Sequence, residues 1–279
     1  MEKIKILDIE NDGMTLAADK QYLYFRGNRS MYKYDLLNSH MAAENTVFKK
    51  DGKARGFSIF DNFVFLYDFL DLYILCKNDL KIKSSLRLGE NLSSDICGIM
   101  WLDASNVYVK MRNGGIYVLD INTNKYDKVQ VSNSSFWSDC TTENYLYVGT
   151  VNGELFEISM KTLEVIRKIQ LCKKNIYGIV HEDGLLYTTS QDQTIKVVDT
   201  ALFETVGIAK KAVTGMVNIA GVHKNNLIIT GDRNPLSLWD KKTLQLYRTV
   251  DFPQNRSTIQ NGNNLFGCDR KSIYKLTLQ

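Results

Sequence analysis

Side chains that could catalyse a reaction are few and scattered in this sequence. The three histidines are His40, His181 and His223, and no His-x-His or Glu-x-x-His spacing gathers metal ligands. We interpret His181 and His223 as polar residues beside turns rather than as ligands or general bases. No Gly-x-Ser-x-Gly motif presents a nucleophile, and no Gly-x-Gly-x-x-Gly or phosphate-loop motif occurs. We therefore expect a non-catalytic protein without a cofactor or a metal.

The cysteines and the net charge exclude further classes of protein. The five cysteines, Cys76, Cys97, Cys140, Cys172 and Cys268, form no Cys-x-x-Cys pair, which favours reduced thiols over a disulfide framework or a zinc site. The formal net charge of +4 is small for a non-specific nucleic-acid binder. No run approaches the roughly 20 apolar residues of a membrane span, and charges interrupt the N-terminus where a signal peptide needs an apolar run. We expect a cytoplasmic protein.

A hairpin pattern recurs along the chain. In residues 185–199 an apolar run is followed by a short polar turn and by a second run in which Ile195 and Val197 alternate with other residues. Positions equivalent to Ile195 recur every 37 to 44 residues, at Met31, Leu72, Ile116, Leu155, Leu236 and Ile273. Helical repeats of similar length need a 3.6-residue period, which is not found. Seven units of about 40 residues with four strands each therefore predict a seven-bladed β-propeller.

The residues at the hairpin turns support this register. Asn113-Gly114 and Asn152-Gly153 fall at the turn, and Asn28 and Asp192 hold the same first turn position. Asn-Gly suits a tight hairpin because glycine has no Cβ to clash at positive φ and asparagine tolerates the left-handed region. In blade four the pattern predicts strands at 136–141, 145–151, 154–159 and 163–171.

The two ends of the chain complement each other. Blade seven has predicted strands near 256–260, 265–268 and 272–278, and it lacks a fourth. Residues 3–9 form a surplus strand ahead of the inner strand of blade one at 14–18. Pairing this surplus strand onto blade seven would cover an exposed sheet edge. We therefore predict an all-β protein, a single domain spanning 1–279, in which the N-terminal strand closes the C-terminal blade.

The sequence resembles WD40 repeats over essentially its whole length. Residues 194–199 and 236–240 are similar to repeat ends, with Trp239-Asp240 as the namesake pair, and Asp35, Asp120 and Asp199 take the aspartate position. The chain has no Gly-His dipeptide, so the buried His–Ser/Thr–Asp–Trp network of strong WD40 blades is missing. Other seven-bladed families, the YVTN and quinoprotein-like propellers, stay open as alternatives. The resemblance implies a rigid scaffold for protein–protein interaction.

Basic residues gather on the predicted loops that join the outer strand of one blade to the inner strand of the next. The resemblance places these loops on the narrower face, around the mouth of a central channel. They carry Lys49, Lys50, Lys53, Arg55, Lys173, Lys174, Lys210, Lys211 and Arg256. Next to them, Trp137 and Tyr177 take equivalent places in neighbouring blades, 40 residues apart.

Basic side chains beside two aromatic rings would suit an acidic peptide, through charge attraction and a rigid apolar platform. Our candidate partner-binding residues are Arg55, Trp137, Lys173, Lys174, Tyr177, Lys211 and Arg256. The alternative is that the lysines serve solubility and that the two rings pack between blades. Strand alternation cannot decide this, because a one-residue shift reverses the face.

Three functions remain open at this point. The leading hypothesis is a scaffold that recognises a protein or an acidic peptide, as a monomeric propeller within a complex. The second is an enzyme or small-molecule binder with a site in the channel, for which Asp139 and Asn218 are the candidates. The third is nucleic-acid contact through the lysine loops, which would weaken steeply with salt. The small net charge favours it least.

Overall fold

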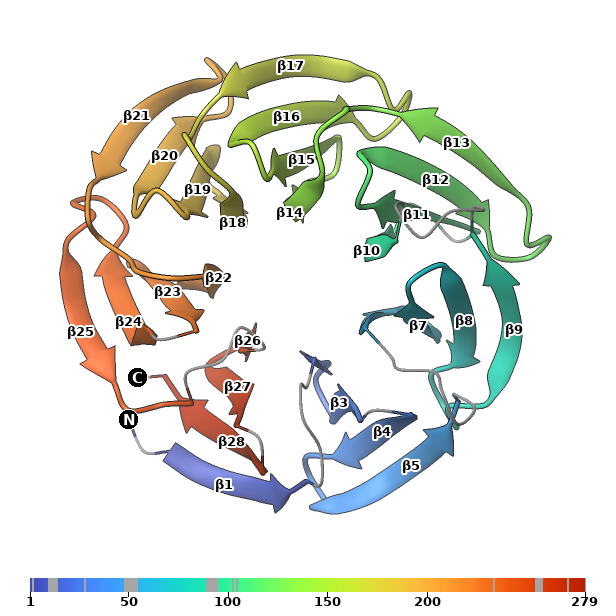
Figure 1. Ribbon diagram of the computed structural model, residues 1–279. Helices are drawn as coiled ribbons and strands as arrows, with labels where there is room; N and C mark the ends of the chain where they lie inside the picture. The colour runs from blue at the N-terminus through green and yellow to red at the C-terminus, as the bar shows by residue number, and fades with distance from the viewer. Residues whose placement is uncertain are drawn as a thin grey trace. The chain divides into compact units, whose positions relative to one another are not determined.

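Seven four-stranded antiparallel sheets make up the fold. The computed structural model describes residues 1, 3–9, 15–27, 29–47, 55–88, 95–101, 103, 105–232, 234–253, 258–269 and 271–278, except for the side chains of Trp101 and Asn234. Each sheet holds four strands in a row (Figure 1). The fold class is therefore all-β, a seven-bladed β-propeller, as the repeat predicted. Nowhere in the described ranges is there a helix with the length and apolarity to cross a membrane.

The chain packs as two compact units. The 131–265 unit comprises Met1–Lys3, Val131–Leu265 and Leu276–Gln279, and the 4–130 unit comprises Ile4–Gln130 and Phe266–Lys275. The strands of the first three blades, all in the 4–130 unit, are β2 (Leu16–Ala18), β3 (Tyr22–Arg26), β4 (Ser30–Asp35), β5 (His40–Thr46), β6 (Gly56–Phe60), β7 (Phe63–Asp68), β8 (Asp71–Cys76), β9 (Ile82–Arg87), β10 (Ile96–Trp101), β11 (Asn106–Met111), β12 (Gly115–Asp120) and β13 (Tyr126–Gln130).

Blades four to six belong to the 131–265 unit. Their strands are β14 (Phe136–Thr141), β15 (Tyr145–Thr150), β16 (Glu154–Ser159), β17 (Val165–Gln170), β18 (Ile176–Glu182), β19 (Leu185–Ser190), β20 (Ile195–Asp199), β21 (Glu204–Ala209), β22 (Val217–His223), β23 (Asn226–Gly231), β24 (Asn234–Asp240) and β25 (Leu246–Val250). In blade four the predicted bounds of the first and third strands are confirmed to the residue, and the outer strand is shorter than predicted at both ends.

The seventh sheet takes its outer strand from the start of the chain. Its order is β1 (Lys3–Asp8), β28 (Ser272–Thr277), β27 (Asn264–Cys268) and β26 (Ile259–Asn261). The backbone N–H of Ile9 donates to the carbonyl of Lys271 at 2.7 Å, and the Ser272 hydroxyl donates to the Asp8 carboxylate at 2.6 Å. Figure 1 shows β1 alongside β28. The predicted closure of the C-terminal blade by the N-terminal strand is confirmed.

Apolar side chains fill the space between consecutive blades within each unit. In the 4–130 unit, Ile74 of blade two packs in one cluster with Val107 and Val109 of blade three. In the 131–265 unit, Ile195 of blade five shares a cluster with Ile229 of blade six. Second and third strands carry most of these residues, because both of their faces are covered, whereas outer strands alternate between buried and exposed positions.

The aspartate that ends the third strand of several blades has a local structural role. Asp35, Asp120, Asp199 and Asp240 each accept backbone N–H bonds from the residues two and three positions later, at 2.7 to 3.1 Å. In blade four the Ser159 hydroxyl accepts the same two bonds at 3.2 Å. This side-chain turn leads the chain into the outer strand, which explains why a short polar residue recurs there.

The hairpin turns agree with the sequence in part. Gly114 and Gly153 have positive φ, at 82° and 78°, and their N–H groups bond back to Met111 and Thr150. Positive φ falls on the glycine and not on Asn113 or Asn152. These turns therefore need one left-handed residue, where a type I′ turn needs two.

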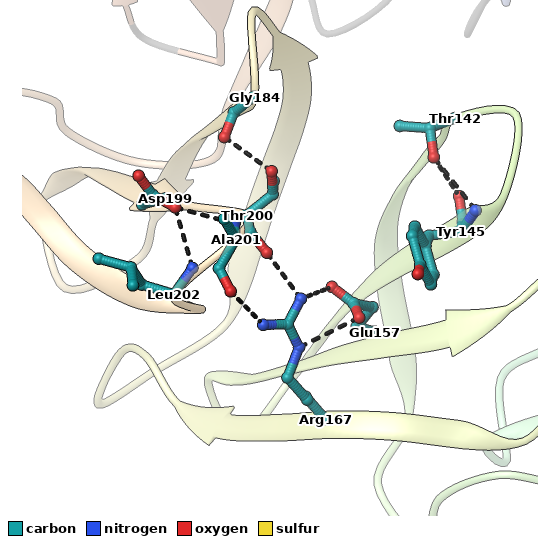
Figure 2. A network of polar contacts seen from close by, with 9 residues as sticks. All are labelled: Thr142, Tyr145, Glu157, Arg167, Gly184, Asp199, Thr200, Ala201 and Leu202. Carbon is teal, nitrogen blue, oxygen red and sulfur yellow. Dashed lines mark hydrogen bonds and ion pairs between the residues drawn. The ribbon is translucent and has the colours of Figure 1, made fainter.

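A polar clamp joins blades four and five (Figure 2). The guanidinium of Arg167, on the outer strand β17, donates to the carbonyls of Thr200 and Ala201 at 2.6 and 2.8 Å. These carbonyls belong to the turn that follows Asp199 in the next blade. The same guanidinium pairs with Glu157 on β16. The clamp fixes the edge of one blade to a turn of its neighbour.

Candidate functional site

Trp137 and Tyr177 lie in contact. Their ring centroids are 5.7 Å apart and their planes meet at 67°, an edge-to-face arrangement. Trp137 is the second residue of β14 and Tyr177 is the second residue of β18, so the predicted equivalence of the two positions is confirmed. Tyr177 is only 7% exposed, whereas Trp137 is half-buried. The pair therefore packs between blades and also reaches solvent through the indole.

Each aromatic residue is the extra residue of a β-bulge. Phe136 pairs with Thr150 and Ser138 pairs with Gly149, so Trp137 has no partner in the ladder with β15. The pairing of Ile176 with Ser190 and of Gly178 with Thr189 leaves Tyr177 in the same position. A bulge re-aims the side chain of the unpaired residue. The two bulges therefore break the regular alternation of side chains at the start of β14 and β18, where the two rings meet.

Two buried hydroxyl groups fix the starts of β18 and β22. The Ser138 hydroxyl donates to the Ile176 carbonyl at 2.8 Å, and the Thr189 hydroxyl donates to the Val217 carbonyl at 2.9 Å. Each accepting carbonyl lies one residue before Tyr177 or before Asn218. A hydroxyl group of one blade thus binds the backbone of the next blade directly before Tyr177 and before Asn218. The bond to Ile176 fixes the backbone beside the aromatic pair.

Gly178 permits the close approach of β18 and β22. A Cβ at this position would lie 2.7 Å from both the side-chain oxygen of Asn218 and the backbone nitrogen of Ile219. No larger residue fits without movement of the β22 backbone. The glycine therefore sets the distance between Tyr177 and the residues that begin the next blade.

The loop carrying Lys173 and Lys174 is anchored from several sides. The N–H groups of Leu171 and Cys172 both donate to the Gly153 carbonyl, at 3.0 and 2.9 Å. The Lys173 N–H donates to the Asp192 carboxylate at 3.2 Å. Cys172 is buried, and this burial raises the pKa of its thiol. Both lysine side chains are exposed, so a fixed backbone presents two ammonium groups to solvent.

Two adjoining pockets lie beside the aromatic pair, both within the 131–265 unit. The first, of about 200 Å³, is lined by Trp137, Tyr177, Met216, Val217 and Asn218. The second, of about 460 Å³, is lined by Lys174, Tyr177, Gln191, Gln193, Gly215, Met216 and Asp232. Tyr177 and Met216 border both pockets. We call the two pockets, with Lys173, Lys174, Lys210 and Lys211 on the two loops that edge them, the lysine–aromatic surface.

Met216 is held in place by its loop. Its carbonyl accepts the Asp232 N–H at 3.1 Å. Gly215, just before it, has a φ of 75°, and a Cβ there would lie 2.8 Å from the Asp232 carbonyl oxygen. Lys210 and Lys211 stand on the same loop and are exposed, and Lys211 itself has positive φ, at 54°.

The charges of these lysines are not neutralised within the described part of the chain. Ion pairs there join other basic residues to carboxylates, but none includes Lys173, Lys174, Lys210 or Lys211. Two carboxylates adjoin the surface: Asp192 accepts the Lys173 N–H, and Asp232 lines the larger pocket with Lys174. Burial opposes ionisation of Asp192, but hydrogen bonds from Thr194 and from the Lys173 N–H outweigh it and keep its pKa below the usual value.

Arg55 and Arg256 are the other two predicted site residues. Arg55 belongs to the 4–130 unit, where its guanidinium lies 3.6 Å from Asp95 and 3.9 Å from Asp68 and covers the Phe69 ring at 3.5 Å. Its charge is thus already paired. Arg256, like Lys49, Lys50 and Lys53, lies outside the described residues.

The two channel candidates have different surroundings. Asp139, two residues after Trp137, is half-buried and pairs with Val148 in the ladder. Asn218 lines the smaller pocket, and its side-chain oxygen accepts the N–H of Ile219 at 2.9 Å. Among the described residues no group of three or more His, Cys, Asp or Glu could hold a metal ion.

Sequence reasoning missed the residues that shape the pockets. Met216, Gln191, Gln193 and Asp232 carry no motif, and the last three come from hairpin turns rather than from the lysine loops. Only the position of two of these residues in the repeat could have indicated that they lie near the site. Gln191 and Gln193 flank Asp192, which the repeat had already placed at a turn beside the loop of blade five.

Comparison with known proteins finds similarity in fold and not in sequence. The sequence matches no family profile and no curated protein. The computationally designed Ika8 protein is 14% identical and aligns over 98% of this chain and 99% of its own, with a TM-score of 0.75. A chain of the Mitotic Checkpoint Complex is 13% identical over 100% of this chain and 91% of its own, with a TM-score of 0.81.

The third comparison is the Cps50 (Swd1) propeller domain of Myceliophteria thermophila, which is 12% identical over 95% of this chain and 96% of its own, with a TM-score of 0.76. At such identities the likeness is one of fold alone. The chain has the fold of a seven-bladed, WD40-like β-propeller.

Proposed function

We propose that this chain is a non-catalytic recognition scaffold, and that its lysine–aromatic surface binds an acidic segment of a partner protein. The observation that carries the proposal is the coincidence of unneutralised positive charge with a fixed aromatic pair. Lys173 and Lys174 project from an anchored loop, and Trp137 and Tyr177 border the adjacent pockets. Rim charges raise the association rate and select the sign of the partner, while rigid aromatic groups supply contact area.

The wider setting supports a protein partner. A propeller chain of the same fold occurs in the Mitotic Checkpoint Complex, which is a protein assembly by its title. Nucleic acids are bound mainly through phosphate contacts, and proteins that bind them without sequence preference carry a larger basic surplus than the formal net charge of +4 found here. The small net charge therefore favours a protein ligand. A cytoplasmic location and a monomeric propeller within a larger complex remain part of this proposal.

Charge reversal tests the proposed function. Proteins captured by the wild-type chain from its native cell would be compared with those captured by Lys173→Glu/Lys174→Glu. The matched control is Lys161→Glu/Lys242→Glu, which changes the net charge equally at exposed turns before the outer strands β17 and β25. We expect the site variant to lose the partner by at least about tenfold, or ~1.4 kcal/mol, and the control to keep it.

Two results would contradict the proposal. One is equal retention of the partner by the site variant and the control. The other is capture that nuclease treatment abolishes, because the ligand would then be a nucleic acid. Binding of the purified partner at several salt concentrations gives a second check, since the contribution of exposed lysines falls with ionic strength.

A further inference from the structure

We infer that the smaller pocket takes one apolar side chain of an extended acidic segment, and that Gln191 and Gln193 bind the main chain of that segment. This inference rests on the proposed function, since it specifies which segment the lysine–aromatic surface binds. It adds an anchor position and a backbone conformation to the requirement for negative charge.

The smaller pocket suits a single apolar group. Four of its five lining residues, Trp137, Tyr177, Met216 and Val217, have aromatic or aliphatic side chains, and Asn218 is the polar member. Its volume of about 200 Å³ compares with the roughly 150 Å³ of an apolar protein cavity that accepts benzene. One phenyl ring or one branched aliphatic side chain fits this space, and two do not.

The pocket walls are fixed before any ligand arrives. Tyr177 is 7% exposed and stands on a bulge whose flanking carbonyl is tethered to blade four by Ser138. The backbone of Met216 is fixed by the bond from its carbonyl to the Asp232 N–H. A preformed pocket spends little binding energy on ordering its own side chains. This is the property expected of an anchor site.

The larger pocket adjoins the smaller one, and its lining adds carboxamide and charged side chains. Both share Tyr177 and Met216, so a chain leaving the anchor position enters the pocket that Gln191 and Gln193 line. Both glutamines are exposed at the β19–β20 turn. A carboxamide offers a donor and an acceptor together, which matches the N–H and C=O of an extended peptide.

The charges fix which residues flank the anchor. Lys174 lines the larger pocket beside the glutamines, and Lys173 precedes it. Asp192 faces its own loop, where its carboxylate accepts the Lys173 N–H and the Thr194 hydroxyl. Asp232 lines the same pocket as Lys174, at the end of β23. Lys173 and Lys174 therefore select acidic residues close to the anchor in the segment.

A random dodecapeptide library displayed on phage tests the inference without a known partner. Selection on the wild-type chain is expected to enrich peptides with one aromatic or large aliphatic residue close to two or more Asp or Glu. For the best peptide, the anchor is replaced by serine, and its affinity is measured on wild type and on Met216→Ala. We expect the serine peptide to bind wild type at least tenfold more weakly. Compared with wild type, we expect Met216→Ala to bind the parent peptide about tenfold more weakly. We expect both proteins to bind the serine peptide with the same affinity.

The controls separate this inference from the proposed function. Leu202→Ala truncates a 66% exposed apolar side chain at the turn before β21 and is expected to leave both affinities unchanged. If peptide binding needs Lys173 and Lys174 but shows no coupling between Met216 and the anchor, the inference is wrong and the proposed function stands. If binding survives reversal of both lysines, or if the library yields no acidic binder, both are wrong.

Discussion

The Arg167 guanidinium and the Glu157 carboxylate form a two-point ion pair in which the carboxylate is 1% exposed. The Arg167 Nε lies 3.1 Å from Oε1 of Glu157 and Nη2 lies 2.6 Å from Oε2. The same guanidinium bonds the turn of blade five (Figure 2). Because Arg167 neutralises a buried charge and ties two blades together, it is a sensitive point of the 131–265 unit.

Arg167→Ala is expected to destabilise the protein by about 3 kcal/mol, because removing one partner leaves the other charge buried and unpaired. The matched control is Lys168→Ala on the same strand, which breaks an ion pair of equal length with Glu154, at 2.6 Å, but with the lysine half-exposed. That pair should contribute less than about 1 kcal/mol. Urea unfolding of the two variants measures the difference. Equal losses would show that the clamp contributes no more to stability than the exposed pair.

Gly178→Ala is expected to cost about 1 to 3 kcal/mol, because the new methyl group would force the β22 backbone away from β18. The same movement should weaken peptide binding at the lysine–aromatic surface. Gly207→Ala in the outer strand of the same blade is the control, since a Cβ there meets its nearest atom at 3.3 Å and that atom belongs to a side chain. Denaturant midpoints and peptide affinity would be measured together. A tolerated Gly178→Ala would disprove the close packing.

Deletion of residues 1–9 is expected to lower the thermal midpoint by at least about 3 °C and to promote self-association, because β28 would then expose an unpaired edge. A synthetic peptide of residues 1–9 should restore part of the loss when added in excess. The control is Lys3→Ala, which removes the ion pair with Asp251 at 2.7 Å but keeps the strand. Thermal melts and light scattering report both effects. A monomeric deletion variant with an unchanged midpoint would contradict closure by this strand.

Asp35 is expected to contribute to acid sensitivity. Backbone hydrogen bonds, first from Asn38, lower its pKa to about 2 in the folded state, below the roughly 3.9 of an unfolded aspartate. The ionised form therefore stabilises the fold above about pH 4, and this contribution is lost as the pH falls toward 2. Asp35→Asn keeps a residue suited to the turn but cannot titrate. Its stability should fall less between pH 5 and pH 2.5 than that of wild type.

Urea midpoints across this pH range provide the measurement. Asp61→Asn, which removes a carboxylate from an exposed turn of the same unit, is the charge-matched control and should follow the wild-type profile. Identical profiles for wild type and Asp35→Asn would show that the turn bonds do not favour the ionised carboxylate.

Local pattern was enough to predict the strands and how they assemble into blades. The first and third strands of blade four, at 136–141 and 154–159, were placed to the residue because turns bound them closely. The pairing of β1 with β28 followed from counting strands. The equivalence of Trp137 and Tyr177 followed from the period alone.

Recurring positions do not imply recurring chemistry, and this limited the prediction of contacts. Lys33 in β4 and Glu157 in β16 take the same place in their ladders, opposite Ala43 and Arg167. Lys33 donates directly to the carbonyls of Lys77 and Asn78 in the next blade. Glu157 instead pairs with Arg167, and it is Arg167 that donates to the Thr200 carbonyl of the next blade. Both residues help to hold the next blade, but the chemistry at one of these equivalent positions does not predict the chemistry at the other. The residue opposite in the outer strand, Ala43 or Arg167, decides which side chain can contact the next blade.

The sequence by itself determined the number of blades, their order and the N-terminal closure, because a two-residue alternation and a 40-residue period are properties of the chain. Tertiary structure decided the site. The bulges at Trp137 and Tyr177 break the alternation, so the direction of the rings depends on pairing with the neighbouring strand. Tyr177 and Met216 border the same pockets, and Gly178 lets β18 and β22 approach closely, so the pockets arise from packing between blades.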